Sequence, residues 1–392
     1  MTVAIDIDAI VIGGGIAGTS VAYFMAPHAR VVVLEREAYP GMHATGRSAA
    51  LFSETYGPTH VRALTRASRA FLDHPPKGFA DHALLSPRGA LIIGAPEQRA
   101  RVQALHEVFR THTNVTFLSE PELRGIVPVL EPQFANIGVH EPGAMDIDVN
   151  SVHQGFIRGL KAHDSTLECS AEIRSIEHSQ GRWIVDTGTR AWRAPLLINA
   201  AGAWADSVAT TAGVTPIGIE PRRRSAFLFA PPAGTVVTHW PFVTSADDGF
   251  YFKPDAGMLL GSPANADPVH AHDVQPEDLD IAMAIYRIEE ATTMRIHRPT
   301  RTWAGLRSFA SDGELVGGFA PDAKGFFWMA GLGGYGIQTC AAMGEACANL
   351  ALGRPLPAHI ADAGITPAIL GIERLGIERL GVERSGVEQL RN

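Results

Sequence analysis

The sequence predicts a mixed α/β protein, in which a doubly wound parallel sheet is interleaved with an antiparallel-sheet layer. Three observations support this fold class. Apolar runs alternate with a segment of helical length near the N-terminus, three strands lead directly into glycine-rich turns, and the middle of the chain contains hairpin-like segments. The 392 residues suffice for about two domains or one large interleaved one.

The N-terminal segment reads as a βαβ unit. Residues 8–12 form an apolar run typical of a buried strand, residues 19–27 have helical character, and residues 31–35 form a second apolar run. Apolar runs at 196–199 and 326–330 also lead into glycine turns, and the second of these turns precedes a long helical stretch. Because the carboxyl ends of parallel strands meet at one edge of a sheet, we expect the three turns to line a common crevice.

The middle of the chain has more β character. Residues 250–253 and 258–261 flank a Pro-Asp-Ala-Gly turn, which is typical of a hairpin. Short strands are expected at 90–93 and 183–186, and an amphipathic helix at 59–73 is expected to stop before two consecutive prolines.

A glycine motif stands between the first strand and the first helix. Gly13 permits a tight turn, Gly15 lets the backbone approach a pyrophosphate, and Gly18 lets the helix pack closely on the strand. Glu35 ends the second strand, where a carboxylate can accept hydrogen bonds from ribose hydroxyl groups. The motif therefore predicts a dinucleotide site, and the acid argues against a phosphorylated ribose.

Composition excludes several classes of protein. The chain has 33 basic and 41 acidic residues, and its formal net charge of -8 without a basic run disfavours nucleic-acid binding. The three cysteines, Cys169, Cys340 and Cys347, form neither a disulfide framework nor a zinc motif, and no histidine has metal-ligand spacing. No apolar run is long enough to span a membrane and the N-terminus lacks signal-peptide features, so we expect a cytoplasmic protein without a metal.

Four segments resemble a known family. They are Glu35-Arg36, Thr45-Gly46-Arg47-Ser48-Ala49-Ala50, Asn199-Ala200-Ala201-Gly202-Ala203-Trp204 and Gly333-Gly334-Tyr335-Gly336-Ile337-Gln338. Together with the glycine motif they are similar to the FAD-dependent D-amino-acid oxidase/glycine oxidase superfamily, and within it to the bacterial FAD-dependent D-arginine dehydrogenases. The resemblance runs from about residue 8 to residue 360.

The resemblance implies FAD, bound non-covalently, as the cofactor. Residues 334–338 are expected to open a helix whose N-terminus faces the flavin, and His43 is interpreted as a residue of the flavin loop rather than a base. The cofactor contacts are expected from Gly13, Gly15, Ile16, Ala17, Gly18, Glu35, Arg36, His43, Ala44, Thr45, Gly46, Ser48, Ala49, Ala50, Ile173, Ala200, Ala201, Gly202, Trp204, Gly333, Gly334, Tyr335, Gly336, Ile337 and Gln338.

An enzyme that oxidises amino acids needs a clamp for the substrate carboxylate, and the planar fork of arginine suits that role. Arg307 stands in an apolar surround, where an unpaired guanidinium would be costly, and Arg224 precedes an apolar strand. The resemblance implies that Arg307 and Tyr251 meet the carboxylate, that Arg224 lines the site, and that Tyr56 lies on a loop able to close over it. Arg222 and Arg223 are interpreted as a solvated basic patch.

Substrate preference is expected to depend on Leu51, Ser53, Ala90 and Gly334. The family members that accept cationic side chains carry an acid where Ala90 stands and a histidine where Leu51 stands. Because the small and apolar residues of this chain offer no partner for a cation, we expect apolar D-amino acids to be preferred over D-Arg and D-Lys.

The resemblance implies a D-amino-acid dehydrogenase. The Cα hydride would pass to flavin N5, and the imino acid would hydrolyse to a 2-oxo acid and ammonia, with an unknown electron acceptor. Two alternatives remain open: a flavin oxidase of glycine- or sarcosine-type amines, and a non-catalytic flavin- or NAD-binding sensor.

The expected domains are discontinuous. Residues 1–83, 146–214 and 303–362 would form the FAD-binding domain, and residues 84–145 and 215–302 the substrate-binding domain. Residues 363–392 contain a five-residue repeat that begins Gly-Ile-Glu-Arg-Leu and fits neither helix nor strand periodicity, so a tail outside the core is expected.

Overall fold

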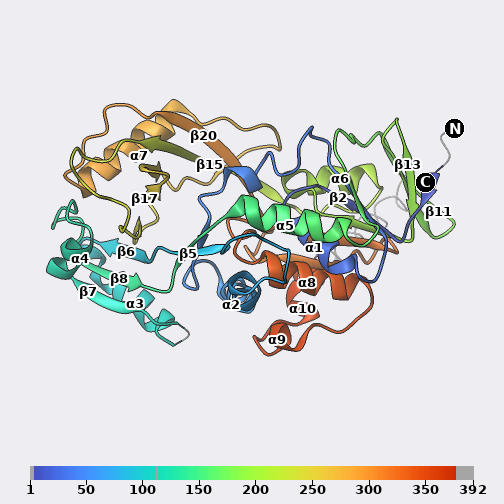
Figure 1. Cartoon of the computed structure of the whole chain (residues 1–392), viewed down its shortest axis with the longest axis horizontal. Helices are drawn as coiled ribbons and strands as arrows, with labels where there is room; N and C mark the ends of the chain where they lie inside the picture. The colour runs from blue at the N-terminus through green and yellow to red at the C-terminus, as the bar shows by residue number, and fades with distance from the viewer. Residues whose placement is uncertain (1–3, 112, 377–392) are drawn as a thin grey trace, which may run out of the picture.

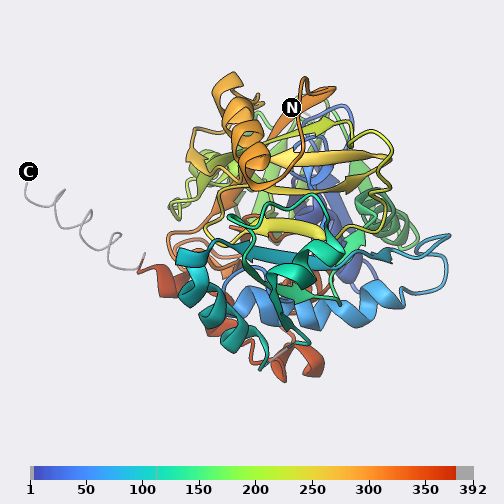
Figure 2. The ribbon, with the colours of Figure 1, turned by 90° about the vertical axis from the view of Figure 1, so that its left-hand side faces the viewer.

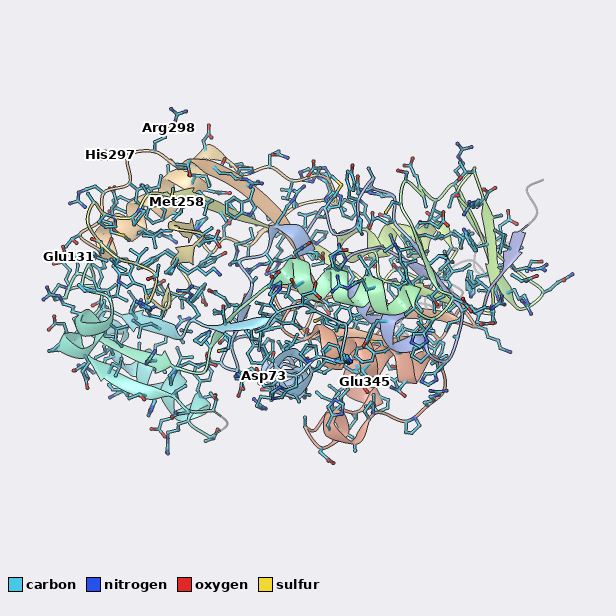
Figure 3. The ribbon with its side chains drawn as sticks, in the orientation of Figure 1. Asp73, Glu131, Met258, His297, Arg298 and Glu345 are labelled. Atoms are coloured by element: carbon cyan, nitrogen blue, oxygen red, sulfur yellow. The ribbon has the colours of Figure 1, made fainter. Side chains whose placement is uncertain are left out.

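The computed structural model describes residues 4–111 and 113–376. The molecule is elongated and has two lobes side by side, with β2, α1, α5 and α6 in one and β15, β17, β20 and α7 in the other (Figure 1). Glu131, Met258, His297 and Arg298 mark the outer end of the second lobe, whereas Asp73 and Glu345 lie along the lower face (Figure 3). No helix in these two ranges combines the length and apolarity that a bilayer crossing requires.

The first lobe, here called the parallel-sheet lobe, is built on a six-stranded sheet. Every neighbouring pair is parallel except the last, in which the edge strand is antiparallel. In spatial order the strands are β10 (Thr166–Glu168), β3 (Val31–Leu34), β2 (Ala9–Ile12), β14 (Leu196–Asn199), β22 (Phe326–Ala330) and β21 (Val316–Phe319). Since β2, β14 and β22 are adjacent, their three turns meet at one edge, as the sequence predicted.

Both faces of this sheet are covered, which explains why its strands are apolar throughout. One face packs against helices and the other against a second, four-stranded sheet together with one helix. The helices of the first face are α1 (Ile16–Met25), α2 (Thr59–Asp73), α5 (Val149–Lys161) and α8 (Cys340–Ala351). The opposite layer comprises β1 (Ala4–Asp6), β13 (Ala191–Ala194), β12 (Arg182–Asp186), β11 (Ser175–Ser179) and α6 (Ala205–Thr211).

The second lobe, here called the antiparallel-sheet lobe, is built on a nine-stranded sheet in which only β16 and β6 are parallel neighbours. Figure 2 views this lobe from its outer side, with α7 above the strands. The strands run β19 (Asp267–Pro268), β15 (Glu220–Phe229), β18 (Met258–Ser262), β17 (Tyr251–Asp255), β16 (Phe242–Ser245), β6 (Ala90–Gly94), β8 (Ile137–Glu141) and β7 (Thr116–Ser119), and β20 (Arg301–Phe309) pairs with β15. The helices packed on it are α7 (Asp278–Ala291), α4 (Glu120–Ile126) and α3 (Arg99–Phe109).

A small three-stranded sheet connects the lobes. Its strands are β4 (Leu51–Phe52), β9 (Met145–Ile147) and β5 (Leu85–Pro87), with β9 in the centre. The predicted hairpin is confirmed, because β17 and β18 are antiparallel neighbours. The predicted helix at 59–73 is confirmed as α2.

Two sequence-based boundaries differ from the structure. Residues 334–338 form turns rather than the first turn of a helix, and α8 begins only at Cys340. The domain boundary expected between 302 and 303 falls inside β20, whose whole length pairs with β15. Cys340 and Cys347 are buried in α8, and burial raises the pKa of Cys340 to about 12.

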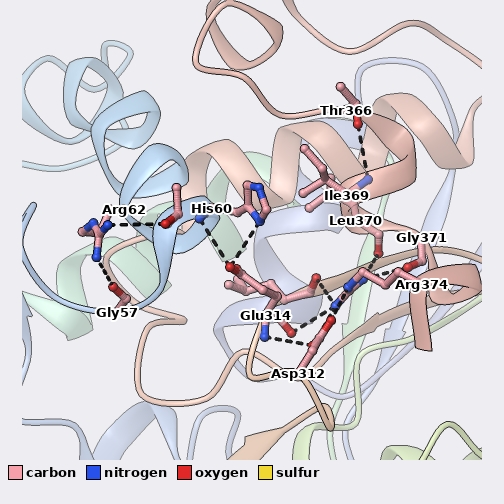
Figure 4. Close-up of polar contacts among 12 residues, drawn as sticks. Gly57, His60, Arg62, Asp312, Glu314, Thr366, Ile369, Leu370, Gly371 and Arg374 are labelled. Atoms are coloured by element: carbon pink, nitrogen blue, oxygen red, sulfur yellow. Dashed lines mark hydrogen bonds and ion pairs between the residues drawn. The ribbon is translucent and has the colours of Figure 1, made fainter. Parts of the chain in front are cut away.

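The expected C-terminal tail was placed too early. Ile365, Leu370 and Ile372 are each no more than 2% exposed, so the segment 363–376 packs on the parallel-sheet lobe and contributes these side chains to its core. Arg374, in the first five-residue repeat, donates to Asp312 at 2.7 Å and to the carbonyl oxygens of Gly371 and Leu315 (Figure 4). The later repeats lie outside the described residues.

Candidate active site

A long cleft lies between the two lobes. It follows the carboxyl ends of the strands of the parallel sheet and reaches β15, β17 and β20 of the other lobe. Its lining includes the glycine motif of the first lobe and Arg224, Tyr251 and Arg307 of the second. An extended cofactor and a small substrate can therefore lie along the same cleft.

The glycine motif forms one end of the cleft. Gly13 has φ of +109°, and a Cβ at Gly18 would stand 1.8 Å from the carbonyl oxygen of Gly13, so neither position tolerates a side chain. Gly15, the N-cap residue of α1, has no side chain to cap the helix, and no acidic residue stands in the first turn. Its N-terminal N–H groups and dipole therefore suit a pyrophosphate.

Glu35 stands beside this turn at the end of β3. Its carboxylate accepts from the backbone N–H of Gly14 at 2.7 Å and of Glu37 at 2.9 Å, and the residue lines the cleft. A fixed carboxylate in this position can also accept from ribose hydroxyl groups. The donor and acceptor set at this end consequently fits the nucleotide half of FAD.

The segment after β3 closes over the same end. Thr45 accepts from the N–H of Ile16 at 3.0 Å, which attaches the segment to the start of α1. Arg36 stacks on Trp204 at 4.0 Å from the ring centroid, and His43 contacts the same ring and Glu37. His43 is thus part of the wall of the cleft, and its ring nitrogen is already engaged by a carboxylate.

Most of the expected cofactor residues line the cleft. The lining set contains Gly13, Gly15, Ile16, Ala17, Glu35, Arg36, His43, Ala44, Thr45, Ser48, Ala49, Ile173, Ala200, Ala201, Gly202, Trp204, Gly333, Gly334, Gly336 and Ile337. The expected residues outside the lining set are Gly18, Gly46, Ala50, Tyr335 and Gln338. Gly18 and Gly46 have a packing role, because an added Cβ would meet backbone oxygens at 1.8 and 2.7 Å.

The other end of the cleft brings together the four residues expected at the substrate. Arg307 on β20, Arg224 on β15 and Tyr251 on β17 all line it. Arg307 Nη1 donates to the Tyr56 hydroxyl at 3.0 Å, and the Arg224 guanidinium lies 5.9 Å from the centroid of the Tyr251 ring. Gly334 allows this approach, since a Cβ there would stand 2.8 Å from the Tyr56 hydroxyl.

Neither guanidinium has a carboxylate partner among the described residues. Arg224 donates instead to the carbonyl oxygen of Asn265 at 2.5 Å. Burial and the neighbouring Arg307 lower the pKa of Arg224. Burial also opposes ionisation of Tyr251, but Arg224 and Arg307 outweigh it and lower the pKa of that phenol. Two positive charges that lack an anion in a cleft of low polarity form a binding site for one.

Of the residues expected to set substrate preference, Gly334 lines the cleft, whereas Leu51, Ser53 and Ala90 do not. Ala90 is the register neighbour of Phe242 on β16 and of Glu141 on β8, so an acid does stand next to it. Glu141 accepts from Ser53 Oγ and from Thr55 Oγ1, each at 2.7 Å. Its carboxylate is therefore already hydrogen-bonded to protein donors. The sequence does not show this acid beside Ala90, because Glu141 reaches it only through the pairing of β6 with β8.

A second acid near the same position is also paired. Asp146 is the register neighbour of Leu51, and it accepts from Lys253 Nζ and from Arg88 Nε, each at 2.7 Å. Both acids around Leu51 and Ala90 thus have protein donors and are not free for a cationic side chain.

The interpretation of Arg223 as part of a solvated patch is wrong. The residue is 9% exposed, and its guanidinium pairs with Asp280 at 3.0 Å, with Asp267 at 3.5 Å and with Glu277. Alternation along β15 explains this, because Arg223 points to the opposite side of the sheet from Arg224. Arg222 is more exposed and pairs with Glu220 at 2.5 Å.

Sequence reasoning missed Arg47, which joins the two lobes at the rim of the cleft. Its guanidinium donates to the carbonyl oxygens of Ala304 at 3.0 Å and Val274 at 3.2 Å, and to Asp273 at 2.5 Å. The residue stands within the Thr45–Ala50 segment, so its neighbourhood was noticed, but its partners lie more than 200 residues away. No pattern in the neighbouring sequence predicts contacts over such a separation.

The fold and the cleft define a class, a dinucleotide-dependent enzyme with an anion site opposite the nucleotide. Comparison with known proteins gives the family: residues 8–350 match the DAO family, FAD dependent oxidoreductase. The chain belongs to this family and is an FAD-dependent oxidoreductase.

Individual relatives are distant. FAD-dependent oxidoreductase domain-containing protein 1 of Bos taurus is 22% identical, over 88% of this chain and 81% of that protein. Glycine oxidase from Geobacillus kaustophilus has a TM-score of 0.78 at 20% identity, covering 89% of this chain and 95% of that one. L-proline dehydrogenase from P. horikoshii has a TM-score of 0.78 at 21% identity, covering 91% and 96%. The solved structures establish a shared fold.

Proposed function

We propose that the protein is an FAD-dependent D-amino-acid dehydrogenase that deaminates apolar D-amino acids to 2-oxo acids and ammonia. The observation that carries the proposal is the pair of guanidinium groups, Arg224 and Arg307, that face the cleft without a carboxylate partner among the described residues. An α-amino acid supplies the carboxylate that this pair lacks. The D configuration rests on the resemblance to D-arginine dehydrogenases.

The proposed roles assign the substrate to one end of the cleft and FAD to the other. Arg307 holds the substrate carboxylate as a fork, Tyr251 donates its hydroxyl to the same group, and Arg224 adds positive charge beside it. Tyr56, 38% exposed, lies over Arg307 and limits the access of water. When bound along the glycine motif, FAD supplies the hydride acceptor at N5. The protein's part is therefore to bind the carboxylate and to fix the direction in which Cα points.

The proposed preference for substrates with apolar side chains is supported by the two nearby acids, because both already have protein donors. Glu141 is held by hydroxyl groups and Asp146 by Lys253 and Arg88, so neither can pair with a substrate cation without losing its own donors. Breaking such a buried pair costs about 2–5 kcal/mol.

Steady-state rates over a panel of amino acids with an artificial electron acceptor test the proposal. We expect kcat/KM to be higher for D-methionine, D-leucine and D-phenylalanine than for D-arginine and D-lysine. A dominant rate with D-arginine contradicts the proposed preference, and faster turnover of the L-enantiomers contradicts the proposed chirality.

A flavin oxidase of glycine- or sarcosine-type amines is the second candidate, and the fold shared with glycine oxidase favours it. Turnover of glycine or sarcosine with stoichiometric formation of hydrogen peroxide, and without an added acceptor, would support this alternative over the dehydrogenase.

A further inference from the structure

Glu141 is a buried acid to which the proposed chemistry assigns no part. It ends β8, is 3% exposed, and has no basic side chain within ion-pair distance in the described part of the chain. Burial raises the pKa of its carboxyl group, and the hydrogen bonds that it accepts offset only part of that effect. A buried acid without a counter-ion depends entirely on its hydrogen-bond donors.

Among the residues that the structure describes, every hydrogen-bond donor to the Glu141 carboxylate comes from one short segment. Oε2 accepts from Ser53 Oγ and Thr55 Oγ1, and Oε1 accepts from the backbone N–H of Glu54, each at 2.7 Å. Three consecutive residues therefore converge on a single carboxylate. Hydrogen bonds to a charged group contribute about 1.5–3 kcal/mol each, so the segment is firmly attached.

The next residue along the chain is Tyr56. Its hydroxyl accepts from Arg307 at 3.0 Å, and its ring packs edge-on against Tyr335 at 5.0 Å between centroids. Gln338 attaches the segment from a second side, because it accepts from the N–H of Ser53 at 3.2 Å and donates to the carbonyl oxygen of Tyr56 at 3.4 Å. Tyr56 itself has few other polar contacts, so its place above Arg307 depends on how its segment is held.

The far end of the same segment is held by α2. His60, in the first turn of α2, contacts Glu314 at 3.2 Å, and Arg62 donates to the carbonyl oxygen of Gly57 at 2.8 Å (Figure 4). This end is exposed in part and lies next to a helix, whereas the Glu141 end is buried. Loss of the Glu141 contacts would therefore release the beginning of the segment while its end stays attached.

We propose that Glu141 is a positioning residue for substrate binding: its buried carboxylate fixes Ser53–Thr55, and that segment holds Tyr56 beside Arg307. This inference rests on the proposed function, since it assumes that the anion bound at Arg307 is a substrate carboxylate. Glu141 does not touch the substrate, and it acts on substrate affinity through Tyr56.

The test compares Glu141→Ala and Glu141→Gln in the FAD-loaded protein, with benzoate as the carboxylate probe. The benzoate dissociation constant is obtained from the change in the absorption spectrum of bound FAD, and therefore does not require turnover. We expect Glu141→Ala to weaken benzoate by about tenfold, about 1.4 kcal/mol. Glu141→Gln should stay within about threefold, because an amide still accepts from the N–H of Glu54 and bonds to the hydroxyl groups.

A double-mutant cycle with Tyr56→Phe separates positioning from general destabilisation. If Glu141 acts through the Tyr56 hydroxyl, Glu141→Ala should weaken benzoate far less in the Tyr56→Phe background than in the wild type. In turnover with the best amino acid of the panel, KM should rise while kcat changes by less than about threefold.

Two further variants distinguish the proposed positioning effect from a folding defect. Ser53→Ala combined with Thr55→Val removes two of the donors and leaves the acid in place, so it should weaken benzoate in the same direction. Glu122→Ala is the matched control, because Glu122 also accepts from a serine hydroxyl and a backbone N–H, both of Ser119, but at the start of the distant helix α4.

The outcomes are distinct. If wild-type protein binds benzoate and Glu141→Ala, correctly folded and FAD-loaded, binds it equally well, the inference is overturned and the proposed function stands. Equal weakening in the wild-type and Tyr56→Phe backgrounds also overturns it. If wild-type protein binds neither benzoate nor any amino acid, the proposed function is wrong. The inference is then wrong as well, because it rests on that function.

Discussion

The two lobes contribute to the cleft in different ways. The parallel-sheet lobe offers glycines, backbone N–H groups at the start of α1 and the carboxylate of Glu35. The antiparallel-sheet lobe offers the charged and phenolic side chains of Arg224, Tyr251 and Arg307 from three strands. We therefore expect cofactor binding to depend on the shape of a short stretch of backbone, and the proposed substrate binding to depend on the register of strands that are far apart in sequence.

The largest effect is expected in the parallel-sheet lobe, from Gly18→Ala. The added Cβ would stand 1.8 Å from the carbonyl oxygen of Gly13, a backbone atom that cannot move aside as the end of a side chain can. We expect loss of FAD binding together with a severe loss of folded protein, measured from the flavin-to-protein absorbance ratio and thermal unfolding. The control is Gly125→Ala in α4, where a Cβ meets nothing within 4 Å. A Gly18→Ala protein with full FAD content would refute the close packing of α1 on β2.

This contrast also explains how far the sequence alone could lead. The βαβ unit and the adjacent strands β2, β14 and β22 were predictable, because glycine turns and apolar runs are local signals. The partners of Arg47, the carboxylates around Arg223 and the segment bound by Glu141 lie tens to hundreds of residues away, and they meet only through strand pairing. The buried Ile372 was missed for a related reason, since a five-residue period has no standard structure to predict.

In the antiparallel-sheet lobe, Arg307→Ala should separate the two functions of the cleft. It removes the guanidinium that is proposed to bind the substrate carboxylate, and it leaves the glycine motif untouched. We expect full FAD content and an increase of about a hundredfold in KM for amino acids, corresponding to about 3 kcal/mol. Arg124→Ala, in an exposed i,i+4 pair on α4, is the control and should leave KM unchanged. An unchanged KM in Arg307→Ala would exclude the clamp.

Arg374→Ala tests whether the parallel-sheet lobe extends to the first five-residue repeat. The side chain is 18% exposed and donates to Asp312 and to several backbone carbonyl oxygens. Its removal should lower the free energy of unfolding by about 2–4 kcal/mol, measured by denaturant titration, because the carbonyl oxygens of the buried residues Leu315 and Gly371 lose their donor. Arg354→Ala, at an exposed position, should change it little. Equal stability of the two variants would mean that the repeat is not part of the core.

The smallest effect is expected from Tyr251→Phe, and it depends on pH. The two arginines lower the pKa of Tyr251, so its hydroxyl should lose its proton below the usual value of about 10. Ionisation removes a donor and adds a negative charge beside the bound carboxylate, so benzoate binding to the wild type should weaken as the pH rises through that pKa. Tyr251→Phe should bind several-fold more weakly at neutral pH and should lack the alkaline decline. A decline of equal size in both proteins would assign it to another group.

The main proposal is that the cleft between the lobes holds an amino acid next to bound FAD. Its most direct test is to add D-methionine to the FAD-loaded protein without oxygen and to follow the visible absorbance of the flavin. We expect D-methionine to reduce the flavin of the wild type, and we expect Arg307→Ala to need a much higher concentration of it. Flavin that stays oxidised with D-methionine and with every other amino acid of the panel would contradict it.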